Sequence, residues 1–408
     1  MAVDDRAEID ADAKKKNIWA LGFVSLFNDV ASEIIYPLIP AFLTSVLGAS
    51  AAALGIIEGA AESLASVLKL VFGRISDKLR KRKPIFIFGY TLAIIVRPLI
   101  AFATIWWHVL VVRLMDRTGK GIRTAPRDAL LADSADEKSR GTAFGLQRAM
   151  DNAGALLGPL VASALIALFM ALHFSKSNAT KLTFLFAYVP GIVALILVLK
   201  FVVELKPSPR ATGEKLPPLW KSGLGGRFYY YLMVVIVFTL GNSTDAFLLL
   251  RAQSAGVSLA MIPILWTLLN ASKVACSLVG GRFADKHGAK RAIFLGWLVY
   301  SAVYFGFAHV RGELPVVILF IIYGLFYGLT EAPERAFVAQ FVRSDLRGSA
   351  YGMYNLAIGI GALPASVIFG YIWKLHGFKS AFHFGAALAL VAAILLLLVK
   401  PPVNQRHS

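Results

Sequence analysis

Gly73-Arg74-Ile75-Ser76-Asp77-Lys78 recurs 208 residues later as Gly281-Arg282-Phe283-Ala284-Asp285-Lys286, and this repetition decides the fold. Two further pairs recur at an offset of 207 residues, and these are Ala125-Pro126 with Ala332-Pro333 and the stretch 140–145 with 347–352. Three matches at nearly one offset are hard to obtain by chance. The chain therefore consists of two related halves that run in the same direction.

Long apolar runs surround these motifs. Of the 408 residues, 57% are apolar, against about 45–50% in a soluble domain. Residues 185–203 and 381–399 are almost free of charge and have the roughly 20 residues that cross a hydrocarbon core. The pattern predicts twelve membrane helices near 18–46, 52–76, 85–105, 107–133, 141–172, 180–204, 228–252, 257–284, 290–309, 313–342, 346–374 and 378–400.

The net charge of +18 could mark a nucleic-acid-binding surface, but its distribution argues for a membrane. Lys and Arg cluster at helix ends: the segments 77–84 and 205–227 carry five each, whereas 47–51 carries none. Such loops lie on the cytoplasmic side of a bilayer. We therefore expect a multi-pass protein of a bacterial inner membrane, with both termini in the cytoplasm and no nucleic-acid partner.

Composition divides the chain into five predicted segments. The stretch between the halves is rich in proline and glycine, which indicates a flexible connection between two bundles. The segments are a cytoplasmic tail at 1–17, a six-helix bundle at 18–204, a cytoplasmic linker at 205–227, a second six-helix bundle at 228–400 and a tail at 401–408.

Several functional classes find no motif in the sequence. Cys276 is the only cysteine and lies in an apolar stretch, so a disulfide or a cysteine-rich metal site is excluded. There is no Walker loop to support ATP-driven pumping, and the seven histidines have no ligand spacing. We therefore expect no enzyme activity, no cofactor and no resident metal.

The repeated loop and the helix pattern resemble the major facilitator superfamily over nearly the whole chain. The signature of that family is a Gly…Asp-Arg-hydrophobic…Arg-Arg loop between helices 2 and 3, and residues 73–82 are a shifted form of it, with a second copy at 281–286. The resemblance implies an all-α membrane protein of two pseudo-symmetric six-helix bundles (the major facilitator fold). It also implies alternating access, a small-molecule substrate and a monomer.

The predicted helix over 141–172 carries Gly154, Gly158 and Pro159. Small residues let helices approach closely, so tight packing is one interpretation. The spacing also resembles the antiporter motif that exporters of the superfamily carry on helix 5, although Ala162-Ser163 replaces the usual glycine pair. The predicted gating residues of the loops and of this helix are Gly73, Asp77, Arg80, Gly281, Asp285, Gly154, Gly158 and Pro159.

Asp29 and Glu33 lie one turn apart on the first predicted helix. Two carboxylates so close cannot both ionise cheaply in a low dielectric. One of them could carry a proton, or Arg113 and Arg117 of the fourth helix could neutralise both. The resemblance favours a coupling role, since proton-coupled exporters often place acids on helix 1 opposite an arginine on helix 4. Lower-ranked coupling candidates on the second helix are Glu58 and Glu62.

Five basic residues form one stripe of the fourth predicted helix, and they are Arg113, Arg117, Lys120, Arg123 and Arg127. Their spacing of three or four residues places them on one face. A charge at mid-bilayer costs several kcal/mol unless it is paired or hydrated. The stripe is therefore expected to face a polar cavity or a carboxylate, and near the cytoplasmic end a purely structural network that includes Asp128 is the alternative.

Other polar residues of the predicted helices are candidates for substrate contact. Asp245 has no basic neighbour in sequence before Arg251, whereas Glu331 could pair with Arg335 four residues on. The substrate-binding candidates are Asn28, Tyr36, Arg117, Arg148, Asp151, Asn242, Asp245, Asn270, Lys273, Tyr327 and Glu331.

The sequence therefore predicts proton-coupled efflux of a small molecule, with protons or another coupling ion and membrane lipid as partners. The outward direction depends mainly on the helix-5 motif, so import stays an alternative. A metal-cation or organic-anion transporter on the same fold is a second prediction. A non-transporting receptor or a lipid scramblase is a more remote one.

Overall fold

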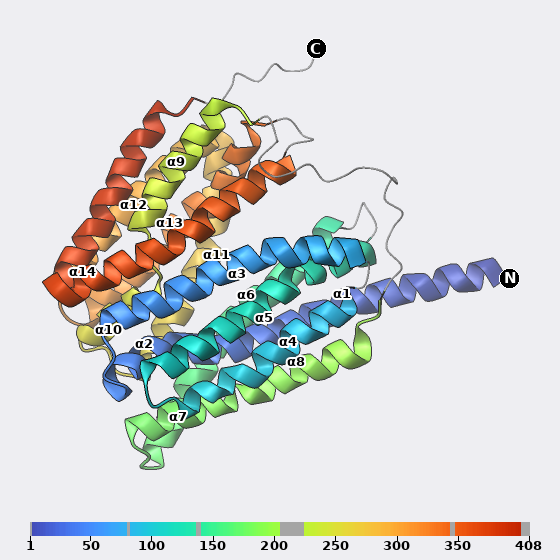
Figure 1. Cartoon of the computed structure of the whole chain (residues 1–408), viewed down its shortest axis with the longest axis horizontal. Coiled ribbons are helices and arrows are strands. Elements are labelled where there is room, and N and C mark those ends of the chain that lie inside the picture. Colours follow the sequence, from blue (N-terminus) through green and yellow to red (C-terminus); the bar gives the residue numbers. More distant parts are fainter. Residues whose placement is uncertain (1, 80–81, 136–139, 205–223, 343–346, 401–408) are drawn as a thin grey trace. The chain divides into compact units, whose positions relative to one another are not determined.

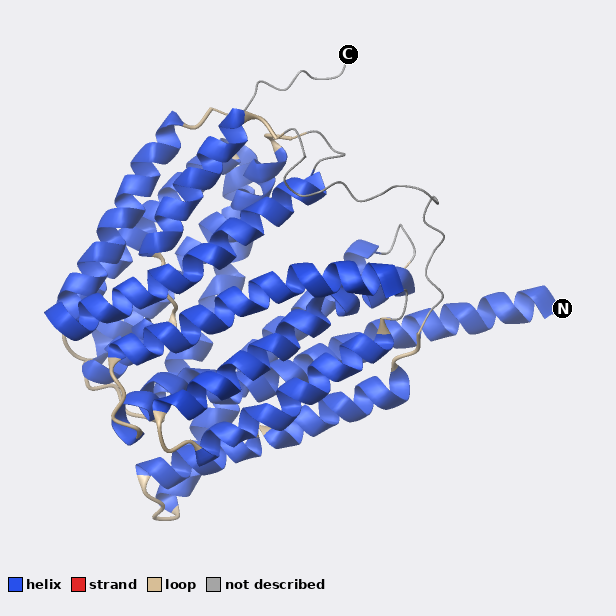
Figure 2. Ribbon diagram, in the orientation of Figure 1, coloured by secondary structure: helices blue, strands red, loops and turns tan. Residues whose placement is uncertain are grey.

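The computed structural model describes residues 2–79, 82–135, 140–204, 224–342 and 347–400, and within them it contains helices and no strand. Figure 2 shows these helices joined by short loops. Most of the predicted linker (205–223) and the predicted tail at 401–408 lie outside the described residues, as does Arg80. The surroundings of Gly73 and the side chain of Asp77 are also outside the description. The stretch predicted as an N-terminal tail falls within a helix that begins at Ala2.

The chain forms two compact units, each described here by itself. The first comprises Met1–Phe42 and Leu64–Glu214, and the second comprises Leu43–Ser63 and Lys215–Ser408. The first half of one long helix, α3 (Ala51–Leu79), therefore packs within the second unit, whereas the sequence had placed this whole helix in the first bundle. The other segment boundaries stay predictions.

The helices of the first unit are labelled in Figure 1. They are α1 (Ala2–Ile35), η1 (Tyr36–Leu38), α2 (Ile39–Ala41), the second half of α3, α4 (Lys83–Val96), η3 (Arg97–Phe102), α5 (Trp106–Ser134), α6 (Arg140–Ala171), α7 (Lys176–Phe186) and α8 (Tyr188–Phe201). Those of the second unit are η2 (Phe42–Val46) after its first residue, the first half of α3, α9 (Gly226–Gly241), α10 (Ala246–Ser254), α11 (Met261–His287), α12 (Ala289–His309), α13 (Glu313–Ala339) and α14 (Arg347–Leu398).

All twelve predicted spans fall on helices, and ten described helical segments are long and apolar enough to cross a membrane. Charged residues keep α5, over the predicted span 107–133, out of the ten. One of the ten, Ala350–Leu398, covers two predicted spans, and Gly377 interrupts it with a φ of 83° at their boundary. The exact number of crossings stays a prediction.

Several predicted spans are helical but not continuous. After Ile35 the first span passes through a short 3-10 turn and a π-helical turn, because Pro37 and Pro40 lack the N–H that an α-helix requires. The predicted helix over 228–252 is also divided: α9 ends at Gly241 and α10 begins at Ala246. The segment between them leaves the helical conformation at Asn242, with φ −93° and ψ 80°.

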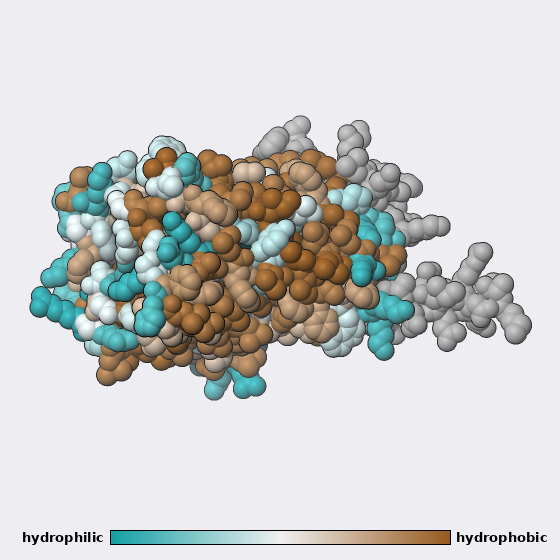
Figure 3. Space-filling view, turned by 90° about the horizontal axis from the view of Figure 1, so that it is seen from below, coloured by the Kyte–Doolittle hydropathy of each residue, from teal (hydrophilic) through white to brown (hydrophobic). Residues whose placement is uncertain are grey.

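The outward faces of the helices are apolar. Leu278, Leu314 and Leu375 are each 69% exposed, and large hydrophobic side chains are exposed on most of the helices. Figure 3 shows one face of the molecule on which hydrophobic residues predominate. Soluble proteins rarely expose apolar area on this scale, whereas lipid tails cover such a surface.

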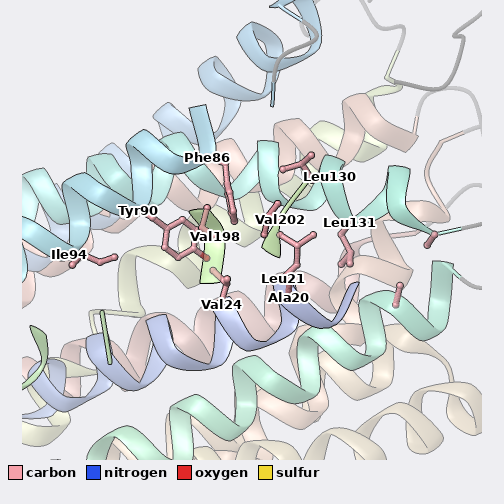
Figure 4. Close-up of a cluster of buried hydrophobic side chains, with 12 residues drawn as sticks. Ala20, Leu21, Val24, Phe86, Tyr90, Ile94, Leu130, Leu131, Val198 and Val202 are labelled. Carbon is pink, nitrogen blue, oxygen red and sulfur yellow. The ribbon is translucent and has the colours of Figure 1, made fainter. Parts of the chain in front are cut away.

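The core of the first unit holds α1, α4, α5 and α8 together (Figure 4). Its side chains include Leu21, Val24, Phe86, Tyr90, Leu130, Leu131, Val198 and Val202. At one end of this core, the buried Asn17 side chain donates to the Ser134 hydroxyl at 3.2 Å and to the Val203 carbonyl at 2.9 Å. The same core positions the charged residues of α1 and α5.

Candidate functional site

Three arginines surround one carboxylate in the first unit. The Arg97 Nε lies 2.7 Å from Asp116 Oδ1, and Arg113 and Arg117 lie 3.5 and 3.8 Å from its other oxygen. Arg97 also donates to the side-chain oxygen of Asn28 at 3.0 Å, which ties η3 and α5 to α1. We call these five residues the Asp116 network. The predicted arginine stripe thus has a carboxylate partner on its own helix.

The sequence reasoning did not select Arg97 or Asp116 as site residues. Arg97 is the only charged residue between positions 85 and 105. A lone charge in an apolar span needs a partner, and this signal could have identified it. Asp116 lies within the arginine stripe, where attention to the basic residues alone left it out.

Asp29 and Glu33 lie at a close contact between α1 and α6. A Cβ added to Gly154 would lie 2.8 Å from the Asp29 Cβ, and one added to Gly158 would lie 2.6 Å from the Glu33 Cβ. Neither distance is compatible with a side chain. The tight packing that the glycine spacing predicted is therefore present, and it occurs at the two predicted coupling acids.

The role of Arg113 as the switching partner of the two coupling acids, Asp29 and Glu33, stays a prediction. In this structure Arg113 pairs with Asp116 three residues on, and its guanidinium lies 5.6 Å from the ring centroid of Tyr36. Asp29 accepts a hydrogen bond from the Asn28 amide at 2.9 Å. Asn28 therefore links Asp29 to Arg97 of the Asp116 network.

Arg127 forms a second charged group in the first unit. Its guanidinium bonds to the hydroxyl of Ser25 at 3.2 Å and to Asp128 at 3.0 Å, and lies 3.8 Å from Asp151. Asp151 also accepts a bond from Gln147 at 3.2 Å. The carboxylate of Asp151 thus faces α5, which the sequence reasoning did not expect. Arg148, the other substrate-binding candidate on α6, is exposed.

The second unit gathers several predicted substrate residues around Asp245. The Tyr323 and Tyr327 hydroxyls donate to the two carboxylate oxygens at 2.9 and 2.7 Å, and the Lys273 ammonium donates at 3.3 Å. That ammonium also lies 3.7 Å from the ring centroid of Tyr327 and 5.1 Å from that of Trp266. We call these five residues the Asp245 cluster. The basic partner of Asp245 is Lys273 of α11, 28 residues further along the chain. A search for basic residues close in sequence could not have found it.

The break between α9 and α10 accounts for the position of Asp245. This residue precedes α10, and its side chain makes no hydrogen bond to the first turn of that helix. The carboxylate is instead available to α11 and α13. Of the other candidates, Asn242 directly follows the last residue of α9, and Asn270 lies on α11 about one turn before Lys273.

Small residues bring α11 and α13 close enough for this arrangement. A Cβ added to Gly324 would lie 2.1 Å from the Ser272 hydroxyl, and one added to Gly328 would lie 2.3 Å from the carbonyl oxygen of Cys276. Cys276 is half-buried in this contact, and its sulfur lies 3.8 Å from the Ser272 hydroxyl. The close approach lets the tyrosines of α13 reach Asp245.

A further carboxylate in the second unit, Glu334, was not selected from the sequence. Its oxygens accept bonds from the Trp297 indole at 3.1 Å and from the Tyr354 hydroxyl. Glu331, which was selected, is exposed on the same helix. Glu331 lies four residues before Arg335 and Glu334 lies directly before it. The sequence alone did not indicate which of the two glutamates is buried.

The remaining predicted residues are dispersed. Glu58 is buried in the second unit, where its helix packs on α14 through Gly55 and Gly59, whereas Glu62 is exposed. Pro159 is buried within α6, and Asp285 and the neighbourhood of Gly281 are open. Over the described part of the chain, no group of three or more His, Cys, Asp or Glu could hold a metal ion.

Comparisons with known proteins agree with this architecture. The model of the Major Facilitator Superfamily matches residues 21–272 and 230–408. An MFS-type transporter of Methanocaldococcus jannaschii is 35% identical over 391 residues, which cover 94% of this chain and 95% of that protein. The class H tetracycline resistance protein of Pasteurella multocida is 22% identical, with 96% of this chain and 97% of that protein covered.

The fold also matches solved structures. The crystal structure of the nucleoside transporter NupG superposes with a TM-score of 0.77 and 14% identity, and covers 94% of this chain and 98% of that one. The family model spans both halves of the chain. The chain therefore belongs to the Major Facilitator Superfamily and is an integral, multi-pass membrane transporter.

Proposed function

We propose that this transporter exports a small organic molecule in exchange for protons, and that Asp29 and Glu33 bind the coupling proton. The observation that carries this proposal is the close packing of Gly154 and Gly158 on these two residues. Both acids are half-buried on a helix that is apolar enough to span a membrane.

The physical argument starts from the cost of two adjacent charges. Carboxylates one turn apart repel each other when both are ionised, and the repulsion is stronger in a low dielectric. Binding of one proton relieves it. Because α6 has no side chain at Gly154 or Gly158 to act as a spacer, a change in charge or hydration at Asp29 or Glu33 acts directly on the α1–α6 contact. Proton binding and helix packing are therefore coupled.

The second unit supplies the proposed substrate contacts. Interrupted helices commonly line the binding sites of transporters, and Asp245 lies at such an interruption. The Asp245 cluster offers a carboxylate, an ammonium, two phenols and an indole. This set suits a small molecule with both polar and aromatic groups.

Two observations bear on direction and substrate. The glycine pattern of α6 resembles that of exporters, and one relative is named for tetracycline resistance. Three guanidinium groups around Asp116 would instead suit an anion. An organic-anion transporter is therefore the second candidate, and transport assays distinguish the two.

The test uses everted membrane vesicles from a host that lacks its own drug exporters. Vesicles are acidified inside, and a pH-sensitive dye reports proton release when tetracycline, a nucleoside or an organic anion is added. We expect one class of compound to release protons with the wild-type protein. The release should be lost in Asp29→Asn with Glu33→Gln and kept in Glu313→Gln, which alters an exposed acid at the start of α13.

Two results would overturn the proposal. One is transport by reconstituted protein that is indifferent to an imposed pH gradient. The other is unchanged proton release in the double variant, provided that it is present in the membrane at the wild-type level.

A further inference from the structure

A groove on the first unit lies apart from the charged groups described above. It is formed by α1 and α8, has a volume of about 420 Å³, and is lined mainly by Lys15, Lys16, Trp19, Phe23, Leu197 and Phe201. Its volume falls within the roughly 300–1,000 Å³ typical of small-ligand sites. The transport proposal does not use any of these residues.

The groove lies against the core of the first unit. Leu21 and Val24 of α1 and Val198 and Val202 of α8 are buried in this core (Figure 4), and Leu197 of the groove lining packs against it. The backbone N–H of Val203 donates to Asn17 at 2.8 Å, and the Asn17 amide returns a bond to the Val203 carbonyl. The two helices are thus locked together beside the groove.

The groove is lined by two lysines at one end and by apolar side chains along the rest of its length. Lys15 and Lys16 are exposed at the basic end. Trp19 and Phe201 expose 45% and 53% of their surface, and the rings of Trp19 and Phe23 are stacked with centroids 6.1 Å apart. Two lysines and several exposed aromatic rings in one groove match a ligand that has an anionic head and a hydrocarbon tail.

The location also favours a lipid. The end of α8 adjoins the basic loop between α3 and α4, because Glu204 accepts bonds from the backbone N–H groups of Arg82 and Lys83. This is the end predicted to be cytoplasmic. Aromatic and basic side chains gather at that interface, where anionic lipids attract lysine.

We propose that the groove binds an anionic phospholipid, with its phosphate between Lys15 and Lys16 and its acyl chains against Trp19, Phe23 and Phe201. The bound lipid would lie across α1 and α8. This proposal is independent of the transported substrate and of proton coupling.

The test is native mass spectrometry of the detergent-solubilised full chain, titrated with dioleoyl phosphatidylglycerol, dioleoyl phosphatidylcholine or inorganic phosphate. We expect phosphatidylglycerol to bind more tightly than phosphatidylcholine. Lys15→Gln with Lys16→Gln should weaken phosphatidylglycerol binding roughly 25-fold, since each lysine near an anionic surface contributes about fivefold. Phe201→Ala should weaken both lipids.

The matched control is Lys374→Gln with Lys379→Gln, which removes the same charge from two exposed lysines near Gly377 and should leave lipid binding unchanged. Equal affinity for the two lipids would overturn the proposal, as would an unaltered affinity in the Lys15 and Lys16 variant. Competition by inorganic phosphate at the same concentration as the lipid would instead identify a free-anion site and would equally overturn it.

Discussion

The Asp116 network and the Asp245 cluster each hold one aspartate carboxylate, but they neutralise it differently. Asp116 lies among three guanidinium groups. Asp245 has two neutral phenols and one ammonium at 3.3 Å, whereas Arg97 Nε lies 2.7 Å from Asp116, within the roughly 2.7–2.9 Å of a strong charged hydrogen bond. The first group is suited to a fixed structural role, and the second to an exchange of partners.

The largest effect should come from removing the carboxylate of the first group. Asp116→Asn leaves Arg97, Arg113 and Arg117 without their shared counter-charge, and breaking a buried ion pair costs about 3–5 kcal/mol. We expect a large fall in the apparent melting temperature in detergent. Asp128→Asn, whose side chain is 38% exposed, is the control and should change it little. Similar melting of both variants would contradict a fixed structural role for the Asp116 network.

A smaller effect is expected where α6 contacts the predicted coupling acids. Gly158→Ala places a methyl group against Glu33, and overpacking of this kind costs about 1–3 kcal/mol. Gly145→Ala on the same helix meets no atom within 4 Å and serves as the control. We expect loss of thermal stability and of proton exchange in the first variant only. If both variants behave as wild type, the α1–α6 contact is not as close as described.

The smallest effect should come from the Asp245 cluster. Tyr327→Phe removes one donor from Asp245, but Tyr323 and Lys273 remain. We therefore expect a loss of about 1 kcal/mol, below the roughly 1.5–3 kcal/mol of a hydrogen bond to a charged group. The measurement is thermal unfolding in detergent, with Tyr371→Phe, an exposed tyrosine, as the reference. A loss as large as that of Asp116→Asn would remove the distinction between the two groups.

The fold was largely accessible from the sequence because hydropathy and repetition are local signals. The 208-residue repeat and the apolar runs predicted helices at each of the twelve ranges, and the family followed from the loop motif. The division at residues 242–245 was missed, although Gly241-Asn242 is a pair that often ends a helix. The assignment of Leu43–Ser63 to the second unit was missed because it depends on tertiary contacts.

The sequence allowed individual residues of the candidate site to be predicted, but not which of them contact each other. Asp245, Lys273 and Tyr327 were each selected as polar residues on apolar spans, and the structure brings them together. The partners of Asp151 and Arg113 were not foreseen, because which helices face each other is set by packing across the whole unit. Spacing along one helix identifies a charged face but not the helix opposite it.

The one cysteine of the chain has a practical consequence. Cys276 lies on α11, one turn beyond Lys273, and its backbone meets Gly328 of α13. The protein thus carries a single thiol, whose sulfur lies 3.8 Å from the Ser272 hydroxyl at the α11–α13 contact. The rate at which a maleimide alkylates this thiol can therefore report movement of α11 against α13. The measurement needs no engineered cysteine and can be made in intact membranes.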